Sequence, residues 1–188
     1  QKDFGYRLGF AYLSSGIINT VLKDIFRIPR VIGHPEIRSL RVETATGYSF
    51  PSGHTQFTTS LWTSLAIQFR RKWIYAVGAL IIMAVALSRL YLGVHTPLDV
   101  VGGFLIGAAW IFAANWIFDA ASKSKNKAFL MGFILPMLIG LWFFRNDAYY
   151  KLAGTLLGYF IGYVVESRYI DYQVKAVLWK QALKFSVG

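Results

Sequence analysis

The chain has 188 residues, of which 55% are hydrophobic and 17% aromatic, and its mean hydropathy is +0.45. Several apolar runs approach the roughly 20 residues with which a helix spans a bilayer, and too few polar positions remain to cover a soluble helical bundle. The net charge of +11 is compatible with nucleic acid, anionic lipid or a phosphate-bearing substrate, whereas the absence of cysteine excludes disulfides and cysteine-ligated metals.

Six apolar segments follow one another along the chain, and none has the period-2 alternation of a strand. They cover residues 4–22, 54–69, 73–92, 97–118, 128–144 and 148–165. We therefore expect an all-α fold, a polytopic transmembrane bundle of about six membrane-spanning helices. We treat residues 1–188 as a single membrane-embedded domain that is cut at one or both ends. The tail, residues 166–188, is expected to form an interfacial helix or the beginning of a further span.

Basic residues in the short connections predict the orientation of these helices. Residues 70–72 join the second and third segments, residues 122–127 join the fourth and fifth, and the tail carries four more basic residues. If every segment crosses, these groups share one side, which the positive-inside rule makes cytoplasmic. The loop of residues 23–53 then lies outside, although it is itself basic. We take its charge as an indication of anion binding, the alternative being charges that are solvated or touch lipid phosphates.

The first cluster of candidate functional residues on the outer side is KDIFRIPR, in which Lys23 and Arg30 are seven residues apart. They lie two turns apart on one face if the helix continues, although Pro29 is expected to break it and to bias Ile28 towards extended geometry. Two cations at the mouth of a bundle would suit a phosphate. The alternative is that they simply reach to the membrane interface, as basic residues at helix ends often do.

The second cluster is FPSGHT, in which Pro51 and Gly53 force a sharp entry into the second helix. Ser52 or Gly53 is expected near its N-cap, where free backbone N–H groups and the helix dipole make an anion site. His54 then lies in the first turn, beside any bound anion, and can protonate a leaving oxygen. The alternative is a plain helix cap followed by an interfacial histidine.

The third cluster is SRLYLGVHTPLD, in which Arg89 ends the third helix with a guanidinium that can bind phosphate oxygens in a bidentate manner. His95 lies in the turn, and Thr96 is expected to cap the fourth helix, with Pro97 at the first helical position. Asp99 can then reach back and accept the Nδ1–H of His95, which would leave Nε2 free as a nucleophile. The alternative for Asp99 is a capping-box acid favoured by the helix dipole.

In order and spacing, the three clusters resemble the type 2 phosphatidic acid phosphatases, also called lipid phosphate phosphatases, which share a core with the vanadium haloperoxidases. The family pattern is K-x6-R-P, then P-S-G-H, then S-R-x5-H-x3-D. Residues 23–99 contain every part of it except the first proline, where Val31 stands. This departure leaves the geometry of the loop open, but not its charges.

The resemblance implies a role for each matched residue. His95 would attack phosphorus and form a phosphohistidine, with Asp99 orienting it. His54 would protonate the leaving alkoxide and then activate water. The phosphate oxygens would be held by five groups, namely Lys23, Arg30, Ser52, the Gly53 N–H and Arg89. Such enzymes need no metal, and we find no acidic cluster in the sequence that suits Mg²⁺ or Ca²⁺ and expect no cofactor.

We therefore predict an integral membrane, metal-independent phosphatase that hydrolyses a phosphomonoester or diphosphate of a lipid. Candidate substrates are phosphatidic acid, phosphatidylglycerol phosphate and polyprenyl diphosphate, and no nucleic acid partner is expected. We place it in the cell membrane, with the site under the 23–53 loop and open to the extracellular or periplasmic side. Three alternatives remain open: a phosphotransferase of the same family, a vanadate-dependent haloperoxidase, and a non-catalytic membrane protein. The last is favoured if His54 and His95 lie far apart.

Overall fold

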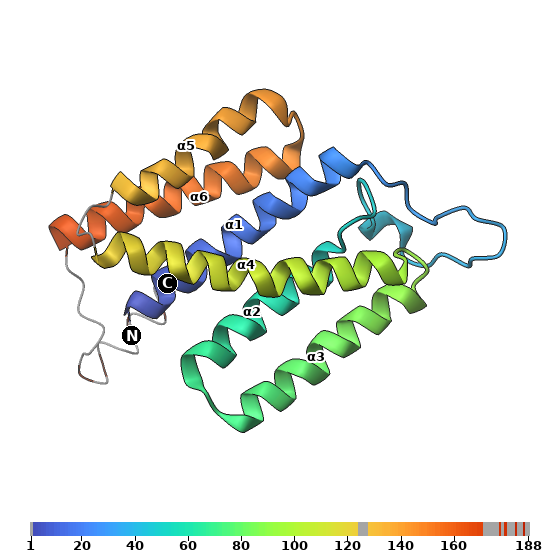
Figure 1. Cartoon of the computed structure of the whole chain (residues 1–188), viewed down its shortest axis with the longest axis horizontal. Coiled ribbons are helices and arrows are strands. Elements are labelled where there is room, and N and C mark those ends of the chain that lie inside the picture. The colour runs from blue at the N-terminus through green and yellow to red at the C-terminus, as the bar shows by residue number, and fades with distance from the viewer. Residues whose placement is uncertain are drawn as a thin grey trace.

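The computed structural model describes residues 2–123 and 128–170, together with the single residues 177, 179, 183 and 186. Within these residues the regular structure is helical throughout (Figure 1). The α-helices are α1 (Lys2–Phe26), α2 (Gly53–Phe69), α3 (Lys72–Tyr91), α4 (Pro97–Lys123), α5 (Ala128–Phe143) and α6 (Asp147–Val165). A 3₁₀ turn, η1 (Val42–Thr44), and a π-helical turn, η2 (Glu166–Ile170), complete the elements. The predicted all-α fold is confirmed, and each predicted apolar segment corresponds to one helix.

Two helices of the described part are long and apolar enough to cross a membrane by length and composition. They are α3, over Lys72–Tyr91, and α4, over Pro97–Ala121, while the apolar stretch Ile134–Phe143 of α5 is shorter. The outer face of α3 exposes more than half of each of three large apolar side chains, Leu80, Met83 and Leu87. A surface of this kind suits lipid tails better than water.

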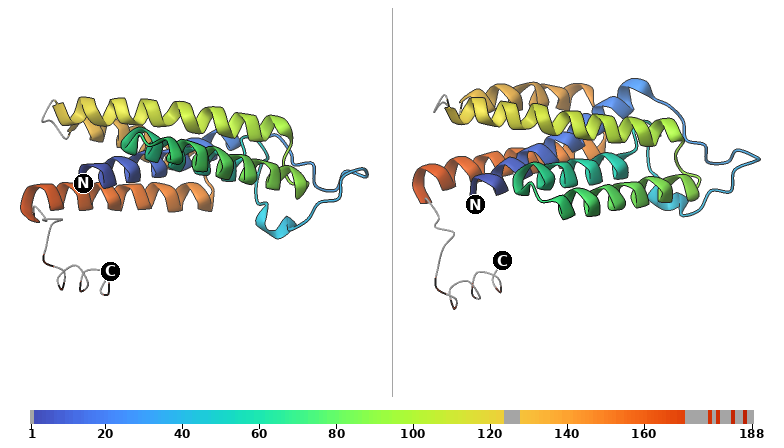
Figure 2. Two further views of the ribbon diagram at one scale, coloured as in Figure 1. Left: turned by 90° about the horizontal axis from the view of Figure 1, so that it is seen from below. Right: turned by 60° about the horizontal axis from the view of Figure 1, so that its bottom comes forward.

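The helices α1, α2 and α4 form the centre of the bundle. The most extensive packing is between α2 and α4, and α1 packs against α2, α4 and α6. Outside this centre, α3 lies at one edge and the α5–α6 hairpin at the other (Figures 1 and 2). The apolar core runs through α1, α4 and α6, where Ile111, Tyr149 and Leu156 are almost completely buried.

Two glycines on α4 let its backbone approach that of α2. A Cβ atom at Gly103 would lie 2.6 Å from the carbonyl oxygen of Ser52, and one at Gly107 would lie 2.7 Å from that of Gln56. Small residues four positions apart on one face allow this close packing of membrane helices. Since α2 begins at Gly53, the contact fixes the place of its N-terminus.

A buried polar network joins α1 to α2 just below that N-terminus. The Asn19 amide nitrogen donates to Gln56 Oε1 at 2.9 Å and to the Pro51 carbonyl at 3.3 Å. In turn, Gln56 Nε2 donates to the Ser15 carbonyl at 2.9 Å, and the Ser15 and Ser60 hydroxyls lie 2.9 Å apart. Polar groups inside a membrane bundle need such partners, and here they tie the start of α2 to α1.

The three motif stretches meet at one end of the bundle. The last turn of α1, the first turn of α2 and the α3–α4 turn lie together there, beside the loop of residues 27–52 (right-hand end of Figure 1). That loop is fastened to the α3–α4 turn, because the Leu40 N–H donates to the Leu92 carbonyl and the Ser39 hydroxyl to the Gly93 carbonyl, both at 2.8 Å. The α2–α3 connection lies at the opposite end.

The end of α1 differs from the expectation that Pro29 breaks the helix. The helix already ends at Phe26, because Arg27 adopts the left-handed conformation with φ of 49°. Lys23 and Arg30 therefore do not share the face of one continuous helix. They come together because the loop that follows α1 places Arg30 in the pocket that Lys23 also lines.

Candidate active site

The three motifs line a single pocket of about 600 Å³ at this end of the bundle. Its walls come from α1, α2, α3, the 27–52 loop and the α3–α4 turn. Six of the predicted site residues line it, namely Lys23, Arg30, Gly53, His54, Arg89 and His95. Two histidines and three cations that are far apart in the sequence are thus brought together, and the arrangement that would have favoured a non-catalytic protein is not observed.

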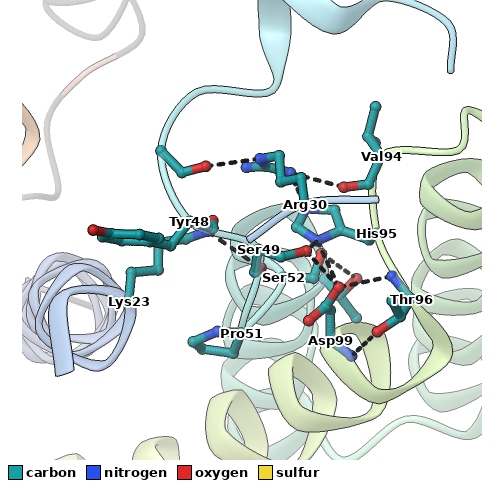
Figure 3. A network of polar contacts seen from close by, with 12 residues as sticks. Lys23, Arg30, Tyr48, Ser49, Pro51, Ser52, Val94, His95, Thr96 and Asp99 are labelled. Atoms are coloured by element: carbon teal, nitrogen blue, oxygen red, sulfur yellow. Dashed lines mark hydrogen bonds and ion pairs between the residues drawn. The ribbon is translucent and has the colours of Figure 1, made fainter. Parts of the chain in front are cut away.

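Asp99 has both of the roles that the sequence left as alternatives. Its Oδ2 accepts the Thr96 backbone N–H at 2.7 Å, while its own N–H donates to the Thr96 hydroxyl at 3.3 Å, which is a capping box. The same Oδ2 lies 3.4 Å from Nδ1 of His95 (Figure 3). Both side chains are buried. The carboxylate therefore caps the start of α4 and also faces the imidazole of His95.

The contact of His95 with Arg30 fixes which ring nitrogen carries the proton. Arg30 Nη1 lies 3.1 Å from His95 Nε2, and a guanidinium can only donate. Nε2 therefore accepts, and the proton is on Nδ1, facing Asp99. Burial lowers the pKa of His95 and the positive charge of Arg30 lowers it further, against an opposing effect of Asp99. The neutral ring with its lone pair on Nε2 is the form that a nucleophile needs.

Arg30 is also a structural clamp for the loops around the pocket. Its Nε donates to the Gly47 carbonyl, its Nη2 to that of Thr46 and its Nη1 to that of Val94, each at 2.9 Å. With the contact to His95, four of the five N–H groups of the guanidinium have partners in the protein. A phosphate that binds Arg30 would therefore exchange some of these contacts for its own oxygens.

Lys23 reaches the same loop from the last turn of α1. Its Nζ donates to the carbonyl of Tyr48 and lies 3.4 Å from that of Ser49. The ammonium thus lies at the pocket wall, next to the segment that precedes α2 (Figure 3).

The first turn of α2 presents Gly53 and His54 to the pocket. Ser52 is the N-cap, yet its side chain makes no capping hydrogen bond. The first N–H groups of α2 are therefore not capped by that side chain and suit an anion. His54 is exposed, and Arg89 lies across from it at the end of α3, where its Nε donates to the Ser88 hydroxyl at 3.2 Å.

Ser52 itself lies beneath the pocket and does not line it. It is completely buried, its N–H donates to the Asp99 carbonyl at 2.9 Å, and its hydroxyl accepts from that of Thr55 at 3.1 Å. The first of these contacts joins the start of α2 to α4. Val31, which replaces the family proline, lies in a turn in which the His34 N–H donates to its carbonyl at 3.2 Å.

Two features of the site were not predicted from the sequence. Ser49 is completely buried, and its hydroxyl lies 2.6 Å from Oδ2 of Asp99, fifty positions along the chain, a contact that no local pattern indicates. The second is a mainly apolar groove of about 490 Å³ between α2, α3 and α4, which shares Trp62 with the polar pocket. Among the described residues, no group of histidine and acidic side chains could hold a metal ion.

Comparisons with known proteins relate the chain to one family. Residues 4–123 match the family model described as PAP2 superfamily, and residues 150–188 match one described as PAP2 superfamily phosphatase, transmembrane extension. A solved structure, the crystal structure of a transmembrane PAP2 type phosphatidylglycerolphosphate phosphatase from Bacillus subtilis, is 26% identical with a TM-score of 0.49. It covers 60% of this chain and 57% of that one.

Three curated relatives illustrate the range of similar proteins. An undecaprenyl-diphosphatase of Sulfolobus acidocaldarius is 30% identical over 58% of this chain and 52% of its own length. A phosphatidylglycerophosphatase B of Bacillus subtilis is 30% identical over 59% and 56%, and sphingosine-1-phosphate phosphatase 1 of Mus musculus is 34% identical over 80% and 37%. The chain spans about half, or less, of the length of these relatives.

Proposed function

Since this chain belongs to the PAP2 superfamily, which matches residues 4–123, we propose that it is an integral membrane phosphatase that hydrolyses a phosphomonoester or diphosphate of a lipid. The reaction needs no metal and passes through a phosphohistidine on His95. The observation that carries the proposal is the pocket in which an oriented, neutral His95 meets His54 and three cations.

In the first step, His95 Nε2 forms a bond to phosphorus and the bond from phosphorus to the lipid oxygen breaks. The ring gains positive charge as the P–N bond forms, and the Asp99 carboxylate beside Nδ1–H stabilises that charge. His54 gives its proton to the leaving oxygen. The three cations of the pocket offset the charge on the phosphoryl oxygens, and Arg30 can transfer its hydrogen bond from Nε2 to one of them.

In the second step, His54, now neutral, takes a proton from a water molecule. The water oxygen attacks phosphorus, the P–N bond breaks, and inorganic phosphate leaves. The electron pair returns to Nε2 of His95 and the proton stays on His54, so both histidines are ready for the next cycle.

The apolar groove favours a lipid over a soluble phosphate ester. Trp62 lines both cavities, so the apolar groove adjoins the pocket, and we assign the groove to the hydrocarbon chain of a lipid whose phosphate lies at His95. The substrates in the names of the relatives are an undecaprenyl diphosphate, a phosphatidylglycerophosphate and sphingosine 1-phosphate, all lipids with a phosphate or diphosphate. We assign this chain a substrate of the same class.

Phosphate release from a panel of lipids tests the proposal. The purified protein in nanodiscs is given phosphatidic acid, phosphatidylglycerol phosphate, sphingosine 1-phosphate and undecaprenyl diphosphate, with glycerol 3-phosphate as the soluble control. We expect release from at least one lipid and much slower release from glycerol 3-phosphate. No release from any lipid, or equal release from the soluble ester, contradicts the assignment.

We further propose that residues 1–188 form one membrane-embedded domain whose pocket opens to the outer side of the cell membrane. The support is that the pocket lies at the opposite end of the bundle from the basic residues 70–72, which the positive-inside rule places in the cytoplasm. The chain has no cysteine, so single cysteines can be introduced at Glu36 in the loop and at Arg71. A membrane-impermeant maleimide on intact cells should label the first and not the second, and the reverse result would place the pocket in the cytoplasm.

A further inference from the structure

Ser49 places a completely buried hydroxyl between Asp99 and His95. Its Oγ lies 2.6 Å from Oδ2 of Asp99 and 3.3 Å from Nδ1 of His95 (Figure 3). A hydroxyl has one proton to donate and two lone pairs that accept, and 2.6 Å to a carboxylate is the range of a charge-assisted hydrogen bond. Ser49 therefore donates to Asp99, and its oxygen faces the Nδ1–H of His95.

The direct contact between Asp99 and His95 is longer than either contact that Oδ2 makes to a fixed donor. Oδ2 is 3.4 Å from Nδ1, beyond the usual 2.7–3.2 Å of an N–H···O bond, but 2.6 Å from the Ser49 hydroxyl and 2.7 Å from the Thr96 N–H. The position of the carboxylate is thus set by Ser49 and Thr96, and the imidazole is oriented against a group that these two hold in place.

The backbone of Ser49 is itself anchored on both sides. Its N–H donates to the Ile28 carbonyl at 2.8 Å, and its carbonyl lies 3.4 Å from Nζ of Lys23. The hydroxyl therefore lies on a segment that is hydrogen-bonded to the end of α1 and to Ile28 in the following loop. Through Ser49, the loop that carries Arg30 is joined to the carboxylate behind the nucleophile.

We propose that Ser49 is a positioning residue of the phosphoryl-transfer site, an inference that rests on the proposed function. Its hydroxyl donates a hydrogen bond to the Asp99 carboxylate and so holds that carboxylate beside Nδ1 of His95. Ser49 does not contact the reacting atoms, and it acts on Nε2 through Asp99 and Nδ1–H.

This role predicts a change in the basicity of His95 when the hydroxyl is removed. The ionisable groups that face His95 are Asp99 on α4, Lys23 on α1, Arg30 in the loop and His54 on α2. Of these, Asp99 alone is negative. Without the Ser49 hydroxyl that carboxylate is no longer held beside Nδ1–H and stabilises the protonated imidazole less, so the pKa of His95 falls.

The experiment compares Ser49→Ala with a matched control, Ser39→Ala. The Ser39 hydroxyl also links the same loop to the α3–α4 turn, at 2.8 Å from the Gly93 carbonyl, but has no contact with His95 or Asp99 among those described. For Ser49→Ala we expect kcat to fall by about 10- to 100-fold, with little change in KM. The acidic limb of the kcat/KM profile should move to lower pH by about half a unit, whereas Ser39→Ala should leave it in place.

A second readout does not need turnover. The chain has three histidines, so the ¹⁵N signals of the His95 ring can be assigned with single variants of His34 and His54 and titrated in nanodiscs. We expect a lower midpoint for His95 in Ser49→Ala. In an Asp99→Asn background, removal of the Ser49 hydroxyl should no longer change the titration midpoint of His95. Should the alanine variant not fold, Ser49→Cys keeps the shape with a weaker donor, and a smaller shift in the same direction is expected.

An unchanged His95 midpoint in Ser49→Ala or Ser49→Cys, or an equal shift in Ser39→Ala, overturns the inference. The wild-type protein on the same lipid separates the two proposals. If it releases no phosphate, the proposed function fails, whereas an active wild type with an unmoved titration refutes the role of Ser49 alone.

Discussion

Replacing Gly103 by alanine should displace the first turn of α2, which we propose to bind phosphate, without touching any group that faces the pocket. The added Cβ would lie 2.6 Å from the Ser52 carbonyl oxygen. Ordinary contacts between carbon and a carbonyl oxygen are about 3.3 Å or longer, so α2 and α4 must separate by about 0.7 Å. Because the near atom is backbone, no side-chain rotation relieves the contact. The start of α2 has to move away from α4, and with it the backbone N–H groups near Gly53.

The size of the effect follows from that displacement. A misplacement of about 1 Å can cost roughly 100-fold in rate, so we expect kcat of Gly103→Ala to fall by about 10- to 100-fold. Overpacking of a close helix contact should also lower the free energy of unfolding by about 1–3 kcal/mol. Gly107→Ala, whose Cβ would lie 2.7 Å from the Gln56 carbonyl one turn deeper, should lose similar stability but less activity.

Phosphate release and the thermal midpoint in nanodiscs are measured for each variant, with Gly158→Ala as the control. A Cβ at Gly158, on α6, meets nothing within 4 Å, and alanine is the better helix former by about 1 kcal/mol. That variant should keep wild-type activity and be as stable or slightly more so. Wild-type activity and stability in Gly103→Ala, or an equal loss in Gly158→Ala, would refute the reasoning.

Three further predictions concern the chemistry. As a general acid and base, His54 should matter in both steps, so His54→Ala should slow formation and breakdown of the phosphoenzyme by roughly 10²- to 10⁴-fold. Rapid-quench kinetics measure the two steps separately, and an unchanged rate for either step would contradict that role. Activity should survive EDTA, because Lys23, Arg30 and Arg89 supply the positive charge of the pocket, and a loss that Mg²⁺ restores would argue for a different site. Burial and Arg30 lower the pKa of His95, so its neutral, nucleophilic form persists to more acidic pH. The acidic limb of kcat/KM should therefore lie below about pH 6.5, the ordinary value for histidine, and a limb above pH 7 would speak against His95 as the nucleophile.

The helices could be predicted from the sequence because each is a long apolar run bounded by polar or turn-forming residues. The segment predicted at residues 148–165 is observed as Asp147–Val165, and the one at 54–69 as Gly53–Phe69. The end of α1 was harder to predict from the sequence. It is set by the left-handed conformation of Arg27, and arginine is not a residue that favours turns.

The site could be predicted to the extent that its chemistry lies in contiguous motifs. His54, His95 and the three cations stand at recognisable spacings, and all of them line the pocket. The contacts of Arg30 with backbone carbonyls, the buried position of Ser52 and the hydroxyl of Ser49 depend on the packing of distant segments. The double role of Asp99 shows the same limit, since a helix cap and a partner of His95 give an identical local pattern.

Direct detection of the phosphoenzyme is the sharpest test of catalysis through a phosphohistidine on His95. The protein is mixed with a lipid whose terminal phosphate carries ³²P, denatured in alkali within milliseconds to seconds, and digested for peptide mapping. We expect label that is stable in alkali and labile in acid, located on the peptide that contains His95, and absent from His95→Ala. Turnover without such a label, or label and phosphate release that persist in His95→Ala, would contradict this mechanism.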